Sequence, residues 1–580
     1  MRIQRRAQPC RFPFTLHIHM RHLAGGMHTS IGAARTGDTL RLRFQLANGC
    51  LNRALNGWQA YLTLPAMKGR AVIFDFQRIA GQLADPCRIL GFGAYIMAIQ
   101  GFQSEAQMGI GQLTDTILSR LEEAATDARA SLDPVVRLGI TGLARAGKTV
   151  FITSLVSNLM DRGRMMGLGA AADGRILAAY LQPQPDDTIP RFDYEGNLAA
   201  LTCAEPHWPE STRAISQLRL SLRLRPGGLL SSMRGARTVH VDIIDYPGEW
   251  LLDLALLDQS FAQWSAQALA RARQASRASL AEGWLAQLEA GDPLAALDEP
   301  RAQDLAAGFT AYLGAARAAG LSPGAPGRFL LPGDLAGSPA LTFAPLSPPG
   351  ARAASNSLYR AFERRYDAYR SQVVKPFFRT HFARIDRQIV LMDVLGALHA
   401  GPAAMQDLRD DMAAVLGAFR PGTDSWLGRL VRRRVDKILF AATKADYLHH
   451  TSHDHMTALT EALLREAADR AHFKGAATQA MAIAALRSTV EQRVQHNGVP
   501  LDCVRGLLSS SGREAALFPG EFPSDPAQVL NAARAGEQHW LQGDFELMNF
   551  LPQAGARRKG DGLPHIRMDQ AVEFLLGDRL

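Results

Sequence analysis

Apolar residues along the chain form short runs of strand length separated by stretches of helical spacing, a pattern typical of an α/β fold. Residues 218–225 alternate strictly between apolar and polar, which predicts an edge strand with one solvated face. Because about a dozen residues join this strand to the run at 238–245, we expect the two to pair antiparallel. Five runs are rich in apolar residues, as expected for strands in the interior of a mostly parallel sheet: 135–141, 238–245, 388–394, 436–442 and 480–486.

Helical spacing predicts much of the remaining chain. Helices are expected over 150–160, directly after the first strand, and over 568–576, near the end of the chain. The long segment between the second and third apolar runs is predicted to be mainly helical, with an irregular loop over the Pro/Gly-rich residues 320–349. The predicted organisation has five parts: a basic N-terminal extension (1–107), the first part of the α/β domain (108–250), a helical insertion (251–386), the second part of the α/β domain (387–500) and a C-terminal extension (501–580).

Charge sets the first part of the chain apart. Residues 1–107 carry 13 Lys+Arg and 4 Asp+Glu, a difference of +9, which leaves 51 basic and 51 acidic residues in 108–580. The main body therefore gives no electrostatic reason to expect a nucleic acid partner. We expect Met108 to be the true start and 1–107 to be an extension outside the fold; an Arg-rich targeting peptide, or a basic arm that touches a membrane or nucleic acid, are the alternatives.

Composition excludes several classes of protein. No run of about 18 apolar residues occurs, so no transmembrane helix is expected. The 5 cysteines form no C-x-x-C pair, which argues against a disulfide scaffold or a structural zinc site and favours a reducing compartment such as the cytoplasm.

The first apolar run ends in a glycine-rich loop. Residues 142–149 are Gly-Leu-Ala-Arg-Ala-Gly-Lys-Thr, the G-x-x-x-x-G-K-[ST] pattern between a strand and a helix. Its backbone N–H groups can turn inward as a nest for phosphate oxygens, and the helix N-terminus adds the positive end of its dipole. Lys148 is expected to reach the β- and γ-phosphates, and Thr149 to ligate Mg²⁺. The predicted nucleotide contacts in this loop are Gly142, Ala144, Arg145, Ala146, Gly147, Lys148, Thr149 and Val150.

The second apolar run ends in Asp245-Tyr-Pro-Gly248, a D-x-x-G motif. Asp245 is expected to hold the Mg²⁺ shell through water. The N–H of Gly248 is expected to meet the γ-phosphate, so that loss of this phosphate moves the segment that follows. Asp242 is the alternative magnesium carboxylate, but it lies in mid-strand.

A third motif, Thr443-Lys-Ala-Asp446, follows the fourth apolar run. The carboxylate of Asp446 can accept hydrogen bonds from guanine N1–H and N2–H₂, whereas adenine offers no such pair of donors. The stem of Lys444 is expected to pack on the base plane. The N–H of Ala485, in the last apolar run, is the candidate donor to guanine O6.

The order of these elements resembles that of Ras-like GTPases: phosphate loop, antiparallel strand, D-x-x-G, plain strand, T-K-x-D, last strand. We therefore predict a Ras-like P-loop NTPase with a mostly parallel sheet, a large helical insertion and a C-terminal extension. GTP or GDP with Mg²⁺ is the expected cofactor.

The segment ahead of the alternating strand supplies candidates for the first switch. Ser211 or Thr212 would ligate Mg²⁺, so the predicted metal ligands are Thr149, Thr212 and Asp245. Arg213 would neutralise phosphate charge, and Trp208 would cover the nucleotide. The alternative is a helix N-cap at Ser211 and Thr212.

Three residues are candidates for catalysis: Lys148, Arg145 and Glu249. Glu249 stands where many GTPases have the glutamine that orients the attacking water, so fast hydrolysis is not expected. It either orients water itself or is a solvated loop acid. Arg145 either stabilises the charge of the transferring phosphoryl group or points to a carboxylate or a partner.

Two clusters have a functional and a plainer interpretation. His449 and His453, at i,i+4, suit a metal ion, but a helix start beside the ribose is favoured. Five aromatic residues near the end of the insertion form either a partner face or, as we favour, part of the core: Tyr359, Phe362, Tyr366, Tyr369 and Phe377.

Several strings resemble, in order, the bacterial YcjX family: residues 142–155 (GLARAGKTVFITSL), 208–213 (WPESTR), 245–254 (DYPGEWLLDL), 443–446 (TKAD) and 564–575 (PHIRMDQAVEFL). The resemblance runs from about Met108 to Leu580. It implies a stress-inducible P-loop protein that binds guanine nucleotides in the bacterial cytoplasm. It also implies an inner-membrane partner of the YcjF type, and with it a peripheral position at that membrane.

The predicted protein binds GTP·Mg²⁺ and hydrolyses it slowly as a switch, with the helical insertion contacting a protein effector. Two alternatives stay open. One is a nucleotide-gated interaction or scaffold protein with negligible hydrolysis, and the other is an ATPase.

Overall fold

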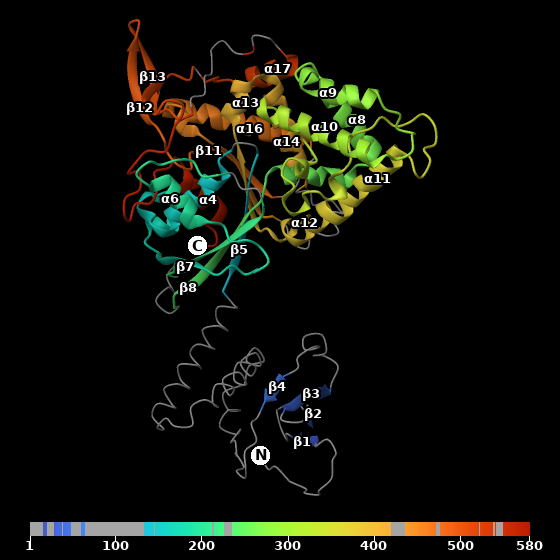
Figure 1. The fold of residues 1–580 in the computed structure, drawn as a ribbon. Coiled ribbons are helices and arrows are strands. Elements are labelled where there is room, and N and C mark those ends of the chain that lie inside the picture. Colours follow the sequence, from blue (N-terminus) through green and yellow to red (C-terminus); the bar gives the residue numbers. More distant parts are fainter. Residues whose placement is uncertain are drawn as a thin grey trace. The chain divides into compact units, whose positions relative to one another are not determined.

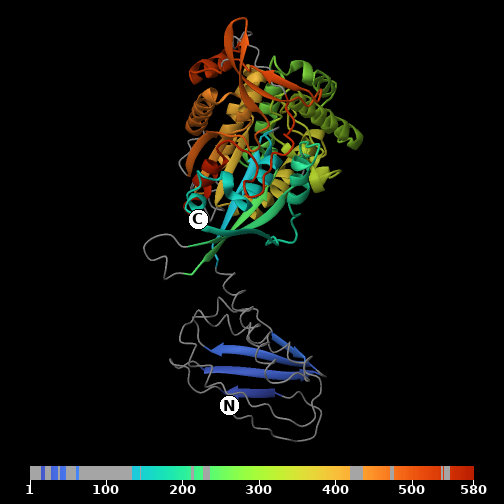
Figure 2. The same ribbon diagram turned by 90° about the vertical axis from the view of Figure 1, so that its left-hand side faces the viewer.

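The computed structural model describes residues 15–19, 28–36, 39–47, 60–63, 133–143, 146–210, 214–225, 235–418, 435–470, 476–520, 522–536, 540 and 549–580. The chain divides into two compact units, Met1–Leu132 and Asp133–Leu580. The first unit contains an antiparallel sheet of order β1-β2-β3-β4: β1 (Thr15–His19), β2 (His28–Thr36), β3 (Thr39–Ala47) and β4 (Ala60–Thr63) (Figure 2). We predict no strand here, although Leu40, Leu42 and Phe44 of β3 alternate with polar residues at period 2.

The second unit is built on a seven-stranded sheet of order β11-β10-β9-β5-β8-β7-β6 (Figure 1). Five strands are parallel: β5 (Val135–Gly142), β8 (Arg237–Asp245), β9 (Arg387–Met392), β10 (Lys437–Ala442) and β11 (Ala477–Ala482). β7 (Ser216–Leu224) pairs antiparallel with β8, and β6 (Ile176–Gln182) pairs antiparallel with β7. The predicted mostly parallel, Ras-like sheet is confirmed.

The prediction that 218–225 is an edge strand is wrong, because β6 covers its outer side. Two of the polar residues that suggested a solvated face, Arg219 and Ser221, are paired with neighbouring strands, whereas Arg223 and Arg225 are exposed. Arg219 donates from Nε to Asp242 Oδ1 of β8 at 2.6 Å, and from Nη2 to Asp242 Oδ2 at 2.8 Å. Ser221 is buried between Gln182 of β6 and His240 of β8, at 2.8 Å from each. Asp242, the alternative magnesium carboxylate, is thus committed to Arg219.

Both faces of the parallel strands are buried, which explains their continuous apolar runs. Successive residues of β9 point to opposite sides: Ile389 packs on one face, with α4 (Lys148–Met160) and α18 (Met568–Leu576), and Val390 packs on the other. That second face is covered by α14 (Pro402–Ala418), α16 (His453–Arg470) and the helical insertion (Figure 1). The helices predicted over 150–160 and 568–576 are confirmed.

The insertion is mainly helical, as predicted, and leads from β8 to β9. Its α-helices are α7 (Glu249–Leu252), α8 (Phe261–Ala272), α9 (Ala278–Glu289), α10 (Glu299–Ala318), α11 (Leu358–Ala368) and α12 (Lys375–Thr380), with a π-helical turn, Tyr369–Val374, between the last two. The five aromatic residues considered for a partner face are all buried. Tyr366, for example, stacks on Trp264 at a centroid distance of 5.1 Å, so the core interpretation is confirmed.

A buried cluster of charges joins the insertion to α14. Asp407 of α14 accepts hydrogen bonds from Arg271 Nη2 at 2.7 Å, from the buried Arg277 and from the backbone N–H of Ser322 at 2.9 Å. Because loss of Asp407 would leave the buried Arg277 without its carboxylate, this cluster fixes where the insertion lies on the α/β domain.

The C-terminal part adds a sheet that the sequence analysis did not predict. β12 (Val490–His496), β13 (Val499–Leu507) and β14 (Glu514–Leu517) pair antiparallel in that order, followed by α17 (Pro526–Ala535). The first hairpin turns at Asn497 and Gly498, both at positive φ, and the domain boundary placed at residue 500 lies within this hairpin. The remaining elements are α5 (Gly169–Ala172), α6 (Tyr194–Thr202), α13 (Val394–Ala400) and short 3₁₀ turns, of which η5 (Asp253–Asp258), η11 (Ala445–Tyr447) and η12 (His450–Ser452) are used below.

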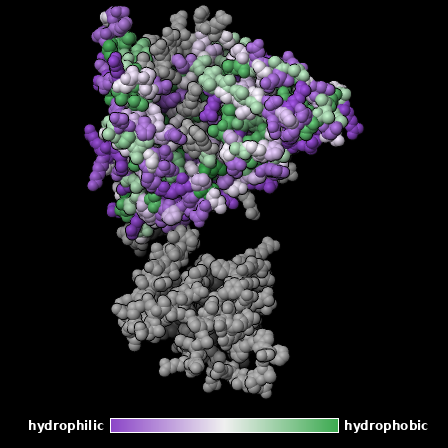
Figure 3. All heavy atoms as spheres, viewed as in Figure 1, coloured by the Kyte–Doolittle hydropathy of each residue, from purple (hydrophilic) through white to green (hydrophobic). Residues whose placement is uncertain are grey.

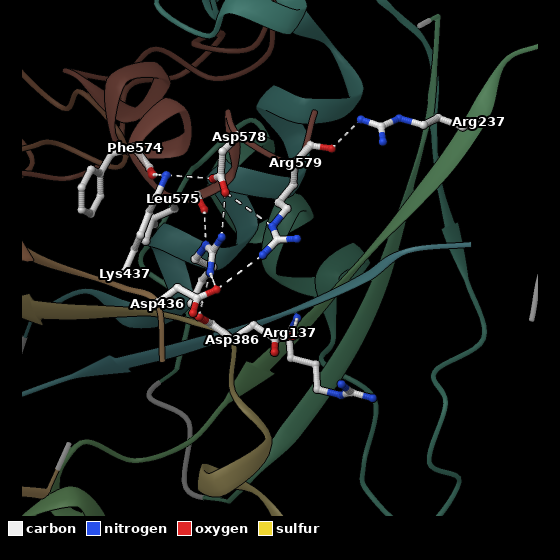
Figure 4. Close-up of polar contacts among 10 residues, drawn as sticks. Arg137, Arg237, Asp386, Asp436, Lys437, Phe574, Leu575, Asp578 and Arg579 are labelled. Atoms are coloured by element: carbon white, nitrogen blue, oxygen red, sulfur yellow. Dashed lines mark hydrogen bonds and ion pairs between the residues drawn. The ribbon is translucent and has the colours of Figure 1, made fainter. Parts of the chain in front are cut away.

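The end of the chain is anchored under the sheet (Figure 4). Asp578 accepts hydrogen bonds from Arg387 Nη2 and Lys437 Nζ, each at 2.8 Å, at the starts of β9 and β10. Arg387 also contacts Asp436 and donates to the Leu575 carbonyl at 3.1 Å. α18 is therefore held at the edge opposite to the phosphate loop, where the parallel strands begin.

No helix among the described residues is long and apolar enough to cross a bilayer. On the face of the second unit drawn in Figure 3, polar and apolar residues are intermixed.

Asp253, in η5, gives the fold a pH dependence. Tyr369 Oη donates to its Oδ2 at 2.5 Å and Gly327 N–H to its Oδ1 at 2.7 Å, and burial raises the pKa of Asp253 to about 7. In the unfolded chain this carboxyl has its ordinary pKa near 3.8. Between these values the folded protein holds a proton that the unfolded chain has lost, so the free energy of unfolding falls as pH rises, by about 1.4 kcal/mol for each unit by which the pKa is raised.

We therefore expect Asp253→Asn to reduce the loss of stability between pH 5 and pH 8, measured by urea unfolding. Asp258→Asn, at an exposed position in the same turn, is the control and should keep the wild-type dependence. Equal pH dependence in wild type and Asp253→Asn would contradict the prediction.

Candidate nucleotide-binding site

The phosphate loop joins β5 to α4 in the form that an anion site needs. Gly147 has φ 73°, a left-handed conformation that glycine adopts without strain, and it is the N-cap of α4. The loop is tied to the sheet because Leu143 N–H donates to the Leu391 carbonyl of β9 at 2.9 Å. The N-terminus of α4 thus lies at the carboxyl end of the parallel strands, where α/β sheets bind their ligands. Ala144 and Arg145 lie outside the described residues.

Lys148 and Asp245 form an ion pair at this edge, with 2.6 Å between Nζ and Oδ1. The pairing follows from the sheet, since Ile140 of β5 lies opposite Asp245 of β8. Both side chains are nearly closed to solvent, with 12% and 1% exposed. Ser216 Oγ donates to Asp245 Oδ2 at 3.3 Å, a contact that no sequence motif indicates.

The oxygen atoms around this pair suit Mg²⁺, which prefers carboxylate and hydroxyl oxygens. Thr149 is buried in the first turn of α4, and its Oγ1 donates to the Glu210 carbonyl at 3.3 Å. Asp245 is fully buried at the end of β8, the strand next to β5. Thr149 and Asp245 are thus the described residues that would hold the ion. Ser211, Thr212 and Arg213, the switch candidates, lie outside the described residues.

Gly248 lies against the phosphate loop itself. A Cβ atom at this position would overlap the Gly142 carbonyl, at 2.5 Å from its carbon atom. Only glycine allows the D-x-x-G segment to approach the loop this closely. The two motifs are therefore in direct backbone contact, and displacement of one must displace the other.

Glu249 points away from this edge, toward the insertion. It is buried, and Arg317 Nη2 of α10 lies 3.7 Å from its Oε1. The guanidinium carbon of Arg328 lies over the ring of the next residue, Trp250, at 3.4 Å from the ring centroid. The burial of Glu249 contradicts its interpretation as a solvated loop acid. Arg317 was not indicated by any motif, because its partner is 68 residues away (317 − 249).

Asp446 lies across the same edge of the sheet, at the end of β10. Its Oδ2 accepts from Ser488 N–H at 2.9 Å and from Ser488 Oγ at 2.6 Å, and its carbonyl accepts from Thr489 Oγ1. Burial raises the pKa of the Asp446 carboxyl, and the hydrogen bonds from Ser488 oppose that rise. Ser488 was not predicted from the sequence; the available signal was the Ser-Thr pair at 488 and 489, separated by one residue from the last apolar run.

Lys444 is anchored at its ammonium group, while packing of its stem on a base stays a prediction. It has φ 62°, and its Nζ lies 2.5 Å from Asp393 Oδ2 at the end of β9. Asp393 Oδ1 in turn accepts the N–H of Gly396 and caps α13. Lys444 therefore ties the loops after β9 and β10 together.

The loop that carries Ala485 contacts the phosphate-loop helix. Its carbonyl accepts the hydroxyl of Ser154 in α4, while the role of its N–H toward guanine stays a prediction. Trp208 donates from Nε1 to the Phe550 carbonyl at 2.7 Å and packs on a small cluster with Leu486 and Leu563. Trp208 thus lies beside the loop after β11, whereas a contact with the nucleotide stays a prediction.

His453 is not placed to bind a metal with His449. Its ring is buried, and Nε2 contacts the carbonyls of Ala445 at 2.7 Å and Leu448 at 3.2 Å. α16 begins at His453, as the helix-start interpretation predicted. This histidine holds the loop of Asp446 in place.

These features define the class: an α/β protein with a phosphate loop and the Ras-like sheet order. The model of the YcjX-like family, DUF463, matches residues 136–580. The chain is 38% identical over 460 residues to "Ras-like GTPase YcjX" of Escherichia coli K12, covering 77% of this chain and 97% of that protein. It is 34% identical over 493 residues to "Ras-like GTPase YcjX" of Shewanella oneidensis MR-1, covering 81% and 100%. The chain belongs to the YcjX-like family.

The contact between Gly248 and Gly142 can be tested by stability. We expect Gly248→Ala to lower the free energy of unfolding by about 1–3 kcal/mol, the usual cost of overpacking, because neither backbone can yield without moving a strand end. Thermal or urea unfolding measures this. Gly283→Ala in α9, where a Cβ meets nothing within 4 Å, is the control and should be neutral or stabilising. A Gly248→Ala protein as stable as wild type would show that the contact is not tight.

Proposed function

We propose that this protein binds GTP or GDP with Mg²⁺ and acts as a molecular switch with slow GTP hydrolysis. The observation that carries the proposal is the pair of charged sites at one edge of the sheet. Lys148 at the start of α4 pairs with Asp245 at the end of β8, and Asp446 at the end of β10 is held by Ser488. One site suits phosphates with Mg²⁺, and the other suits a guanine base.

The phosphate part works by exchange of partners. In the structure Lys148 and Asp245 neutralise each other in a nearly dry site. When a nucleotide binds, its phosphate oxygens would pair with the Lys148 ammonium, and Mg²⁺ would pair with the Asp245 carboxylate. Each buried charge would then keep a partner of opposite charge. The loop amides up to Gly147, together with Ala146 and Val150, would surround the phosphates. Arg145 would supply further positive charge.

The base part depends on an ionised, oriented carboxylate. Ser488 donates two hydrogen bonds to Oδ2 of Asp446, which holds the carboxylate and favours its charged form. Guanine N1–H and N2–H₂ would complete its acceptors, and Ala485 N–H would meet O6. Adenine has no donors at the N1 and C2 positions, so we propose that the site prefers GTP to ATP.

The switch would be transmitted to the insertion through three consecutive anchors after Gly248. These are Glu249 with Arg317, Trp250 with Arg328, and Asp253 with Tyr369 and the N–H of Gly327. Because these anchors are buried, a movement of Gly248 at the γ-phosphate would be passed to the helices instead of being lost in a flexible loop. A protein effector would then bind the insertion.

Burial of Glu249 also favours the second candidate, a nucleotide-gated interaction protein with negligible hydrolysis. Its carboxylate is directed to Arg317, so it is not free to orient water without breaking that pair. By resemblance to the family, we further propose a stress-related role in the bacterial cytoplasm, with a YcjF-like inner-membrane partner that brings the protein to the membrane surface. No nucleic acid partner is proposed.

Base specificity is tested by competition of GTP and ATP for the purified protein. We expect GTP to bind more tightly, and Asp446→Asn to weaken GTP at least about tenfold, since a hydrogen bond to a charged group contributes about 1.5–3 kcal/mol. The same variant should prefer xanthine nucleotides, because its amide can donate to the xanthine carbonyl. Asp454→Asn, at an exposed carboxylate in α16, is the control. Equal affinity for ATP and GTP would refute the assignment.

Hydrolysis is tested by single-turnover measurements with GTP. A slow rate that falls at least tenfold in Arg145→Ala, with GTP affinity retained, is expected if this arginine stabilises the transferring phosphoryl group. No turnover in either protein, with GTP still bound, would replace the GTPase by the nucleotide-gated scaffold.

A further inference from the structure

Two imidazoles and a carboxylate converge beside the loop of Asp446. His449 and His450 come from the start of η12, and Glu491 comes from β12. Their ligand atoms all lie within 4.8 Å of one another. His450 Nδ1 is 2.8 Å from Glu491 Oε2, and His449 Nε2 is 3.7 Å from the same oxygen. The tertiary structure brings these groups together across 41 residues of chain.

In metal-binding histidines, the ring nitrogen that does not bind the metal usually donates its N–H to an oxygen atom, and His449 has such oxygen partners. Its other nitrogen, Nδ1, lies 3.0 Å from Thr451 Oγ1 and 3.7 Å from Asp502 Oδ2 of β13. A proton on Nδ1 is therefore favoured by two oxygen partners, which leaves the lone pair of Nε2 facing Glu491. The ring is also restrained by burial, with 12% of the side chain exposed.

We propose that His449 Nε2, His450 Nδ1 and Glu491 bind a divalent transition-metal ion of the zinc, cobalt or nickel type. Tetrahedral zinc with nitrogen and oxygen ligands at about 2.0–2.2 Å separates ligand atoms by roughly 3.3 Å, between the two distances seen here. Two nitrogen ligands select against Mg²⁺ and Ca²⁺. The His450 ring is largely exposed, at 65%, so the remaining coordination position would be open to water.

This site would join the two segments that hold the proposed guanine contact. Asp446 precedes His449 by three residues, and Ser488 precedes Glu491 by three residues. A metal bridge between His449 and Glu491 would restrict the relative movement of Asp446 and Ser488 before the base arrives. This second step rests on the proposed function: the ion would preorganise the base site and tighten guanine binding.

Without a metal the same groups satisfy one another. Glu491 Oε1 lies 3.5 Å from Arg487 Nη2, and Oε2 accepts from His450.

Metal binding is tested on the full chain without nucleotide, by cobalt titration followed through visible absorption and by equilibrium dialysis with zinc. Wild type should bind one tight equivalent more than His450→Ala or Glu491→Gln, and cobalt should show the strong absorption of a four-coordinate site. Asp502→Asn should weaken the site about 10–100-fold through the orientation of His449. His455→Ala, in α16 outside the cluster, is the matched control. Equal stoichiometry in wild type, His450→Ala and Glu491→Gln would overturn the metal site.

Coupling is tested separately with a fluorescent guanine nucleotide in constant Mg²⁺. Zinc should tighten binding several-fold in wild type and in His455→Ala, and leave Glu491→Gln unchanged. A protein that binds cobalt at this cluster but no guanine nucleotide refutes the proposed function and not the metal site. Nucleotide affinity that is the same with and without zinc overturns the coupling.

Discussion

The ion pair between Lys148 and Asp245 is the interaction on which the rest of the site depends. The ammonium group at the start of α4 and the carboxylate at the end of β8 would be costly to bury separately, and together they fix where α4 and the D-x-x-G segment meet. The backbone contact of Gly248 with Gly142 holds the same junction without side chains. A ligand that carries both negative charge and a cation can replace this pair without leaving either charge alone, which is the chemical character of a nucleotide phosphate with Mg²⁺.

The insertion is attached to this junction and not only to the outer face of the sheet. Glu249, Trp250 and Asp253 lie within five residues after Gly248, and each is buried and has a partner on a later segment of the insertion. At its other side the insertion is held to α14 by the cluster of Arg271 and Arg277 around Asp407. The insertion is therefore attached to the α/β domain at two places, the segment after Gly248 and α14. A movement of Gly248 would shift the first attachment while α14 holds the second.

Predictions from sequence patterns were wrong or missing where polar residues have partners that are distant in the sequence. β7 has the alternation of an edge strand, yet Arg219 is neutralised by Asp242 and a further strand, β6, covers its outer side. The Asn497-Gly498 dipeptide is a good hairpin signal, but β12, which precedes it, is mostly polar and has no run of alternating apolar residues. Ser488 and Arg317 carry no motif, so their roles follow from position alone.

The amino-acid sequence by itself determined every strand of the central sheet except β6, the helices α4 and α18, and the motifs at the strand ends, because apolar runs and glycine-rich loops act locally. The 3.6 and 2.0 periods of helix and strand do not depend on distant residues. Tertiary structure decided which charges face one another: Lys148 with Asp245, Glu249 with Arg317, and His449 with Glu491. Coulomb and hydrogen-bond energies depend on distances of a few ångströms between residues far apart in the chain, and no local period records those distances.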